Sequence, residues 1–249
     1  MIADCEWDYL STLRTVREPP EALPRLRDLL EYLAQPGLEH VWVLLDIKTD
    51  DDGEELLSQT AKTIASVPSP GRAWKERIVL GPWNANYIQF CRERLPGFPI
   101  AYVGFSLFYA SKFLKEPNVN FNMLQQTLVG PVGSMFITAV KKAERNLYVW
   151  TVNDEHWMEW SIKKQVDGVI TDDPKLFLEV CERWKKRAGT STLPAGLMGR
   201  EESSAARRVK LYAHAFMMQM LVLVLTGIFW RRFITRGGRN RGKGVKIKT

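Results

Sequence analysis

The sequence has few of the residues that several common kinds of site require. Its three cysteines, Cys5, Cys91 and Cys181, are scattered and odd in number, which excludes a disulfide framework and a zinc-knuckle spacing. We expect them to be buried or free thiols. There is no Gly-x-Ser-x-Gly elbow, no glycine-rich phosphate loop and no Asn-x-Ser/Thr sequon. The sequence therefore gives no sign of a serine hydrolase, a P-loop nucleotide site or N-glycosylation.

Histidine is also scarce, with three in 249 residues. His40 precedes an expected strand and so lies on the wrong rim for catalysis. His156 lies at the start of an expected helix, and His214 lies in a long apolar segment. We expect each to be structural or solvated, because no two of them form a plausible acid and base pair.

Negative charge is missing from the last 19 residues. Positions 231–249 contain eight lysines and arginines and no acid, so this tail alone contributes +8 to a net charge of +7, which leaves −1 for residues 1–230. The basic character belongs to the tail and not to the body of the protein. This argues against a nucleic-acid-binding domain.

Expected strands alternate with expected helices along residues 1–186. This alternation is typical of β/α units around a parallel sheet. A closed (β/α)8 barrel needs eight strands and about 250 residues, whereas six strands fit here, so we predict an α/β fold with an incomplete (β/α)8 barrel, strands 3 to 8. The expected strands are 41–48, 77–80, 100–105, 121–124, 147–152 and 168–171; the expected helices are 23–34, 54–65, 86–94, 107–114, 133–145, 155–164 and 174–186.

The C-terminal part has a different organisation. We predict a partial barrel domain at 1–186, a linker at 187–208, a membrane-anchoring helix at 209–230 and a basic tail at 231–249. Positions 211–230 carry no charge apart from a possible one at His214, and at ~1.5 Å per residue they span the ~30 Å hydrocarbon core. Basic residues flank both sides, so a single-pass span and a hairpin-like anchor both stay open.

An acid and a base end the first expected strand. Side chains alternate along a strand, so Leu44, Asp46 and Lys48 point to one face. Two opposite charges at the tip of an apolar strand are costly to bury without partners. A metal, a phosphate or each other would satisfy them. The alternative is a surface ion pair followed by a solvated loop at 50–53.

Three other strand ends carry candidate residues. Trp83 directly follows one strand, and Trp150 and Asn153 end another. Asp172 follows the last strand, before Asp173 and a proline that suit the start of a helix. In barrels of this class the site lies at the carboxyl ends of the strands. A packed tryptophan and a turn-forming asparagine are the alternative interpretation.

Three segments carry motifs at the expected strand ends: 44–48 (Leu-Leu-Asp-Ile-Lys), 149–154 (Val-Trp-Thr-Val-Asn-Asp) and 166–174 (Val-Asp-Gly-Val-Ile-Thr-Asp-Asp-Pro). In sequence and order they resemble the glycerophosphodiester phosphodiesterase family. The resemblance covers about residues 8–186, and aspartate in place of the usual glutamate at position 46 resembles the fungal phosphatidylglycerol phospholipase C branch. It implies a (β/α)8 barrel, a divalent metal (Mg²⁺ or Ca²⁺) and cleavage of a phosphodiester next to a glycerol.

The resemblance also implies roles for individual residues. Asp46 matches a metal-binding carboxylate, and Lys48 matches the lysine that faces the phosphate, which we take as the catalytic candidate. Trp150 and Asn153 match site-rim residues of the family's seventh strand. Together with Trp83 and Asp172, whose positions after strands make them candidates, they are our expected substrate-binding residues. The family's His-Arg-Gly and Glu-x-Asp motifs are absent, so we expect an N-terminally incomplete chain in which metal binding is weak or absent.

Two functions follow as hypotheses. The first is a membrane-anchored phosphodiesterase acting on glycerophospholipids or glycerophosphodiesters, inactive or truncated in this form. The second is a non-catalytic membrane protein that binds lipid or a partner through the same scaffold. The expected location is a membrane, such as an endomembrane or the lipid-droplet surface, and no oligomeric state is readable. A third alternative is that residues 1–185 do not fold by themselves.

Overall fold

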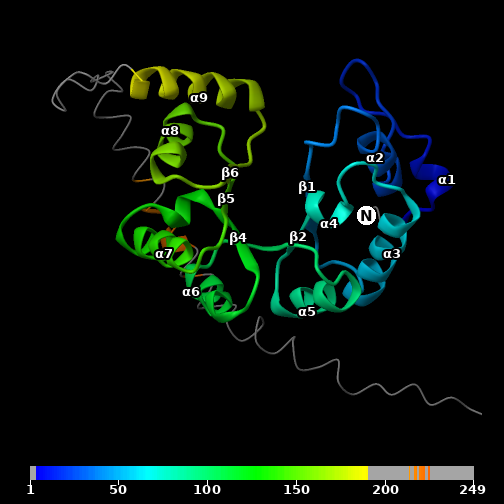
Figure 1. Cartoon of the computed structure of the whole chain (residues 1–249), viewed down its shortest axis with the longest axis horizontal. Helices are drawn as coiled ribbons and strands as arrows, with labels where there is room; N and C mark the ends of the chain where they lie inside the picture. The colour runs from blue at the N-terminus through cyan, green and yellow to red at the C-terminus, as the bar shows by residue number, and fades with distance from the viewer. Residues whose placement is uncertain (1–3, 190–212, 214–215, 218, 222–223, 225–249) are drawn as a thin grey trace, which may run out of the picture. The chain divides into compact units, whose positions relative to one another are not determined.

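The computed structural model describes residues 4–189, 213, 216–217, 219–221 and 224. Six strands form a sheet in the order β1-β2-β3-β4-β5-β6, and the paired strands run parallel (Figure 1). This confirms the α/β class, and the sequential order is that of an incomplete (β/α)8 barrel. The chain divides into two compact units, Met1–Ala101 and Tyr102–Thr249, each of which is described by itself.

The first unit is built around the buried strand β2. All five residues of β2 are buried, and β2 contacts the helices α4 and α5. Leu57 of α3 and Leu30 of α2 are fully buried in the same unit. Its elements are α1 (Trp7–Leu10), α2 (Leu26–Leu33), β1 (Val43–Ile47), α3 (Gly53–Ser66), α4 (Trp74–Arg77), β2 (Ile78–Pro82), α5 (Ala85–Arg94) and the start of β3 (Ile100–Gly104).

The second unit has its core along β4 and β5. Phe121, Met123 and Val149 have no exposed surface, and Met158 of α8 is equally buried. Buried apolar area of this kind contributes about 25 cal/mol per Å² to folding. The elements are α6 (Leu107–Ser111), η2 (Lys112–Lys115), β4 (Val119–Leu124), η3 (Gln125–Leu128), α7 (Pro131–Lys142), β5 (Leu147–Trp150), α8 (Glu155–Lys164), β6 (Gly168–Val169) and α9 (Pro174–Gly189).

Several helices that the sequence predicted begin after a short polar residue whose side chain caps the helix. Asp52 accepts hydrogen bonds from the backbone N–H groups of Glu54 and Glu55 at the start of α3. Asn84 and Asp154 make similar bonds at α5 and α8. Each satisfies an N–H group that the helix itself leaves without a partner, which is typically worth about 1 kcal/mol.

The strand predicted at 77–80 is wrong at its first residue, since Arg77 ends helix α4 and β2 begins at Ile78. Arg77 is 1% exposed. Its Nε donates to the carbonyl of Val41 at 3.0 Å, and its Nη2 donates to the carbonyls of Leu33 and Leu38, both at 2.8 Å. The side chain therefore joins α2 to the segment leading into β1. Sequence periodicity gave no sign of this contact.

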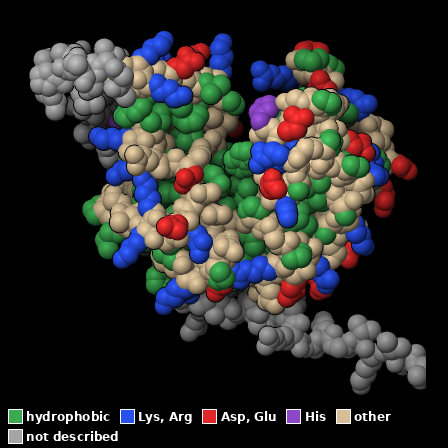
Figure 2. Space-filling model, in the orientation of Figure 1, with side chains coloured by type: hydrophobic (Ala, Val, Ile, Leu, Met, Phe, Trp, Pro, Cys, Tyr) green, Lys and Arg blue, Asp and Glu red, His purple; other side chains and the backbone are tan. Residues whose placement is uncertain are grey.

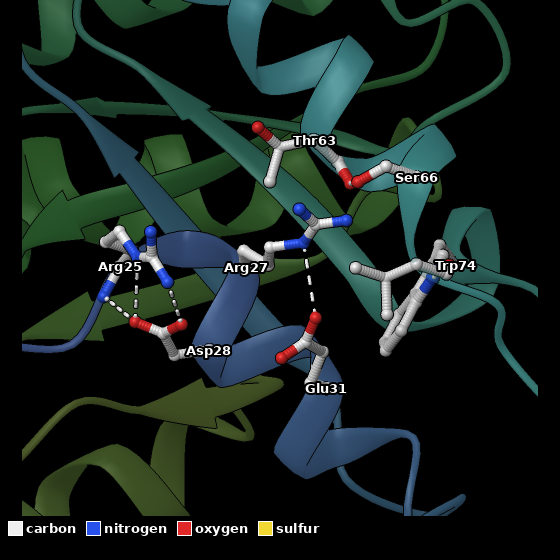
Figure 3. Close-up of polar contacts among 8 residues, drawn as sticks. Arg25, Arg27, Asp28, Glu31, Thr63, Ser66 and Trp74 are labelled. Carbon is white, nitrogen blue, oxygen red and sulfur yellow. Dashed lines mark hydrogen bonds and ion pairs between the residues drawn. The ribbon is translucent and has the colours of Figure 1, made fainter.

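Helix α2 is shorter than predicted and has ion pairs along its exposed side (Figure 3). Asp28 accepts hydrogen bonds from the Arg25 side chain and from the Arg25 backbone N–H. The side-chain bond, followed by the backbone bond, lowers the pKa of the Asp28 carboxyl to about 2. Figure 3 also shows Arg27 facing Glu31, one turn further along the helix, at 3.2 Å.

Asp28→Asn is expected to remove a pH-dependent part of the stability of α2. Because folding lowers the pKa of Asp28 from 3.8 to about 2, its stabilisation is present above pH 4 and is lost as the pH falls through 2. The wild-type protein should therefore lose its advantage over the variant across this window. Urea unfolding at pH 7, 4 and 2.5 would measure it. Glu31→Gln, in the neighbouring ion pair, is the control, and an equal pH response in both variants would contradict the prediction.

The predicted membrane-anchoring helix and basic tail lie almost wholly outside the described residues, as does most of the linker. The described residues at 213, 216–217, 219–221 and 224 are helical. Among the residues that the structure describes, no helix has both the length and the apolar character needed to cross a bilayer.

Candidate active site

The register of β1 against β2 places Asp46, Lys48 and Trp83 at the same edge of the sheet. Asp46 lies opposite Gly81, and the last register pair joins Ile47 to Pro82. Lys48 directly follows Ile47, and Trp83 directly follows Pro82. Gly81, the register partner of Asp46, has no side chain. These are the carboxyl ends of parallel strands, where sites of β/α proteins form.

The three side chains contact one another directly. The Lys48 ammonium lies 2.7 Å from Asp46 Oδ2. The Trp83 indole N–H donates to Asp46 Oδ1 at 2.6 Å, and Lys48 Nζ lies 4.7 Å from the centre of the Trp83 ring. The sequence left three partners open for Asp46 and Lys48: a metal, a phosphate or each other. In the structure, Asp46 and Lys48 pair with each other. The structure adds Trp83, which sequence reasoning had only placed after a strand.

The loop that follows Lys48 is fastened by Tyr87 of α5. The Tyr87 hydroxyl donates to the carbonyl of Asp51 at 2.7 Å. The phenol ring covers Gly53, where an added Cβ would lie 2.6 Å from the ring. A larger side chain at this position would have to displace the phenol ring, so glycine allows Tyr87 to lie over the start of α3. Burial, and after it the charge of Asp51, raises the pKa of the Tyr87 hydroxyl.

The cluster formed by Asp46, Lys48 and Trp83 contributes little to the stability of the fold, and its ammonium group can bind an anion. The side chains of Lys48 and Asp46 are 60% and 47% exposed, and such ion pairs are worth about 0–1 kcal/mol. An ammonium has three N–H donors. With one directed at Asp46, the others are available to a phosphate oxygen, and the indole face favours a positive charge beside it.

A second group of candidate residues lies in the other unit, at the ends of β5 and β6. Asn153 Nδ2 donates to Asp172 Oδ2 at 2.6 Å, while Asn153 Oδ1 accepts from the Asp172 backbone N–H at 2.9 Å and from the Thr171 hydroxyl at 3.1 Å. Trp150 Nε1 donates to the carbonyl of Asn122 at 3.1 Å. Asp173 caps α9 through the N–H of Leu176, as the sequence led us to expect. The structure therefore brings Asn153 and Asp172 together.

Asn153→Ala is expected to loosen the segment between β6 and α9. The variant loses three hydrogen bonds at an exposed position, which corresponds to about 1–2 kcal/mol of stability because water replaces part of them. Amide hydrogen exchange of residues 170–173 should become faster. Asn146→Ala, at the other end of β5, is the matched control, and unchanged exchange at 170–173 would show that Asn153 does not order this loop.

Comparison with known proteins decides the family. The family model described as "Glycerophosphoryl diester phosphodiesterase family" matches residues 1–176. The chain belongs to this family.

Solved structures show the same fold at low sequence identity. A protein described as a glycerophosphoryl diester phosphodiesterase from Silicibacter pomeroyi DSS-3 is 18% identical with a TM-score of 0.57, over 66% of this chain and 58% of its own. A glycerophosphodiester phosphodiesterase from Parabacteroides distasonis ATCC 8503 is 19% identical with a TM-score of 0.57, over 74% of this chain and 72% of its own. The chain thus spans 58% of the length of the first of these two relatives.

The described residues do not fit the divalent metal that the family implies. Both carboxylate oxygens of Asp46 already accept short hydrogen bonds, from Lys48 and from Trp83. The described part of the chain also contains no group of three or more His, Cys, Asp or Glu side chains that would hold a metal ion. Oxygen-ligated cations need about six donors. No catalytic step is therefore assigned to a metal.

Three other results bear on the sequence predictions. Cys5, Cys91 and Cys181 form no disulfide with one another, and Cys91 is buried. His40 lies before β1 and is exposed, and His156 is the second residue of α8, where its ring packs against Trp157. Tyr87 was missed. Its signal was Asn84, a capping residue that fixes the helix on which Tyr87 sits, together with the glycine that follows the three aspartates.

Proposed function

We propose that this protein acts on phosphodiesters next to a glycerol, in glycerophospholipids or in soluble glycerophosphodiesters, at a membrane. The observation that carries the proposal is the Lys48 ammonium, held at the carboxyl end of β1 by Asp46 and Trp83. A half-exposed cation at that position suits a phosphodiester anion. Membership of the family supports the reaction class.

Each residue of the cluster has a distinct role in the proposal. Lys48 donates to a nonbridging phosphate oxygen and neutralises charge that grows in the transition state. Asp46 orients the ammonium, and Trp83 both fixes Asp46 and covers one side of Lys48. In hydrolysis water attacks phosphorus, the bond to one alcohol oxygen breaks, and the proton passes to that alcohol.

The finer assignment is the phospholipase C-like branch that aspartate at position 46 suggests. Its substrate would be phosphatidylglycerol, cleaved to diacylglycerol and glycerol phosphate. The apolar positions 211–230 and the basic residues around them favour a membrane as the partner and the location. A membrane-bound enzyme has its lipid substrate at high local concentration, which makes the two parts of the proposal consistent.

The test is product analysis with the protein purified from its native cells and with the 249-residue chain. Each is mixed with phosphatidylglycerol vesicles or with glycerophosphoglycerol, with Mg²⁺, Ca²⁺ or EDTA, and products are identified by mass spectrometry. Diacylglycerol and glycerol phosphate support the phospholipase C-like assignment, and phosphatidic acid supports cleavage on the other side of phosphorus. Because Asp46 is the one carboxylate of the cluster, we expect the metal dependence of the 249-residue chain to be weak or absent.

Absence of turnover by the native protein on both substrates would overturn the proposed activity. Vesicle flotation without turnover would then favour the non-catalytic, lipid-binding alternative. Neither flotation nor turnover would remove the membrane part of the proposal as well.

A further inference from the structure

The C-terminal segment is described at residues 213, 216–217, 219–221 and 224. Its apolar side chains are exposed, whereas its glutamine is half-buried and bonded to the protein. Gln219 is half-buried, and its Nε2 donates to the carbonyls of Gln126 at 2.9 Å and Val129 at 2.6 Å. The apolar neighbours on the segment are 46–64% exposed: Phe216, Met217, Met220, Leu221 and Val224. A helix at a water-facing surface normally shows the opposite arrangement.

The segment is fastened to a defined edge of the second unit. Gln126 belongs to η3, which directly follows strand β4, and Val129 precedes α7. Figure 1 shows the short orange pieces of the segment beside α7. Carbonyls that follow a strand lie at its carboxyl end. Gln219 therefore holds the apolar residues near the carboxyl edge of the second unit, where Asn153 and Asp172 also lie.

Helices α6 and α7 present further apolar side chains where they begin, at the same edge. Val132 and Met135 are 68% and 72% exposed and lie three positions apart, so they share one face of α7. Phe108 is exposed in the first turn of α6, and α6 contacts α7. Removal of such side chains from water is favourable, so this face suits an apolar environment.

Basic residues accompany these apolar side chains. Lys112 Nζ lies 5.4 Å from the ring centre of Phe108. Figure 2 shows Lys and Arg side chains beside hydrophobic ones over α6 and α7. In the sequence, Arg207, Arg208 and Lys210 precede the apolar positions and the eight-charge tail follows them. A second copy of this chain would bring the same positive charges together, whereas an anionic lipid surface is complementary to them.

We propose that the carboxyl edge of the second unit lies against an anionic phospholipid surface, with Phe108, Val132 and Met135 at the interface beside the segment that Gln219 holds. The inference rests on the membrane association proposed above. The inference goes further by identifying the surface of the second unit that contacts the lipid. The strand ends that carry Asn153 and Asp172 are then directed toward phospholipid headgroups, and an amphipathic surface of this kind reaches about 5–10 Å into the headgroup boundary.

The test uses an environment-sensitive fluorophore (NBD) on single cysteines in the full chain. Met135→Cys reports the proposed interface, and Lys142→Cys, at the other end of α7, is the matched control. Cys5→Ser and Cys181→Ser remove accessible thiols, while burial raises the pKa of the Cys91 thiol to about 12 and keeps it unreactive. Vesicles contain phosphatidylglycerol and phosphatidylcholine in equal parts, with and without brominated acyl chains.

We expect label at position 135 to gain emission several-fold on the vesicles, to shift to shorter wavelength and to be quenched by the brominated lipid. Label at position 142 should change little. Gln219→Leu keeps the apolar character of the segment but removes its two hydrogen bonds, so flotation should persist while the response at 135 falls toward that at 142.

Each other outcome has a distinct meaning. Flotation with equal, unquenched label at both positions overturns the inference and leaves membrane association standing. No flotation of any form overturns both. A blue shift at position 135 in the absence of vesicles would show that a second copy covers this face, which also overturns the inference.

Discussion

Lys48→Met is expected to lower phosphodiester turnover by about 10²–10³-fold, the range found when a group that stabilises transition-state charge is removed. Methionine keeps the unbranched shape and most of the length of the lysine side chain but has no charge. Binding of the neutral parts of a lipid should change little, so the loss should fall mainly on kcat. The measurement is the rate of glycerol phosphate release from phosphatidylglycerol by the native protein.

The fold should survive this change. The pair that Lys48 forms with Asp46 is about half exposed and contributes at most about 1 kcal/mol. Lys62→Met, at an exposed position of α3, is the matched control and should keep its full rate. Asp46→Asn should also be slower, because an amide holds the ammonium less firmly. If Lys48→Met and Lys62→Met turned over at the same rate, the site assignment would be wrong.

Arg77→Met is expected to destabilise the first unit by about 3 kcal/mol or more. Three backbone carbonyls, of Leu33, Leu38 and Val41, lose a charged donor, and two of these bonds are 2.8 Å long. Hydrogen bonds to charged groups are worth about 1.5–3 kcal/mol each, and a buried carbonyl left without a donor carries its own desolvation cost. Urea unfolding followed by circular dichroism would measure the change.

Arg72 provides the control for this prediction. It is exposed and belongs to the same unit, where its guanidinium reaches the carbonyls of Glu39 and Glu76 at 3.4 and 3.3 Å. Arg72→Met should change stability by no more than about 0.5 kcal/mol, as surface substitutions usually do. Equal midpoints for the two variants would show that the buried contacts of Arg77 carry no special stability.

Local patterns predicted the elements well where sequence and tertiary contacts agree. The helix at 155–164 begins after Asp154, a capping residue, and was predicted with the bounds that the structure shows. Short elements were missed, including α1 and α4, because four residues are too few for a hydrophobic period. Strand ends shifted by up to two residues, since pairing with neighbours decides where a strand stops.

The sequence by itself determined the fold class, the family and the edge of the sheet at which the candidate residues lie. These follow from the order of strands and helices and from motifs within single segments. Only the tertiary structure decided which side chains meet. Trp83 reaches Asp46 from 37 positions away, Arg77 reaches Leu33 from 44, and Gln219 reaches Val129 from 90. Such contacts depend on the register and packing of elements distant in sequence, and no local period encodes them.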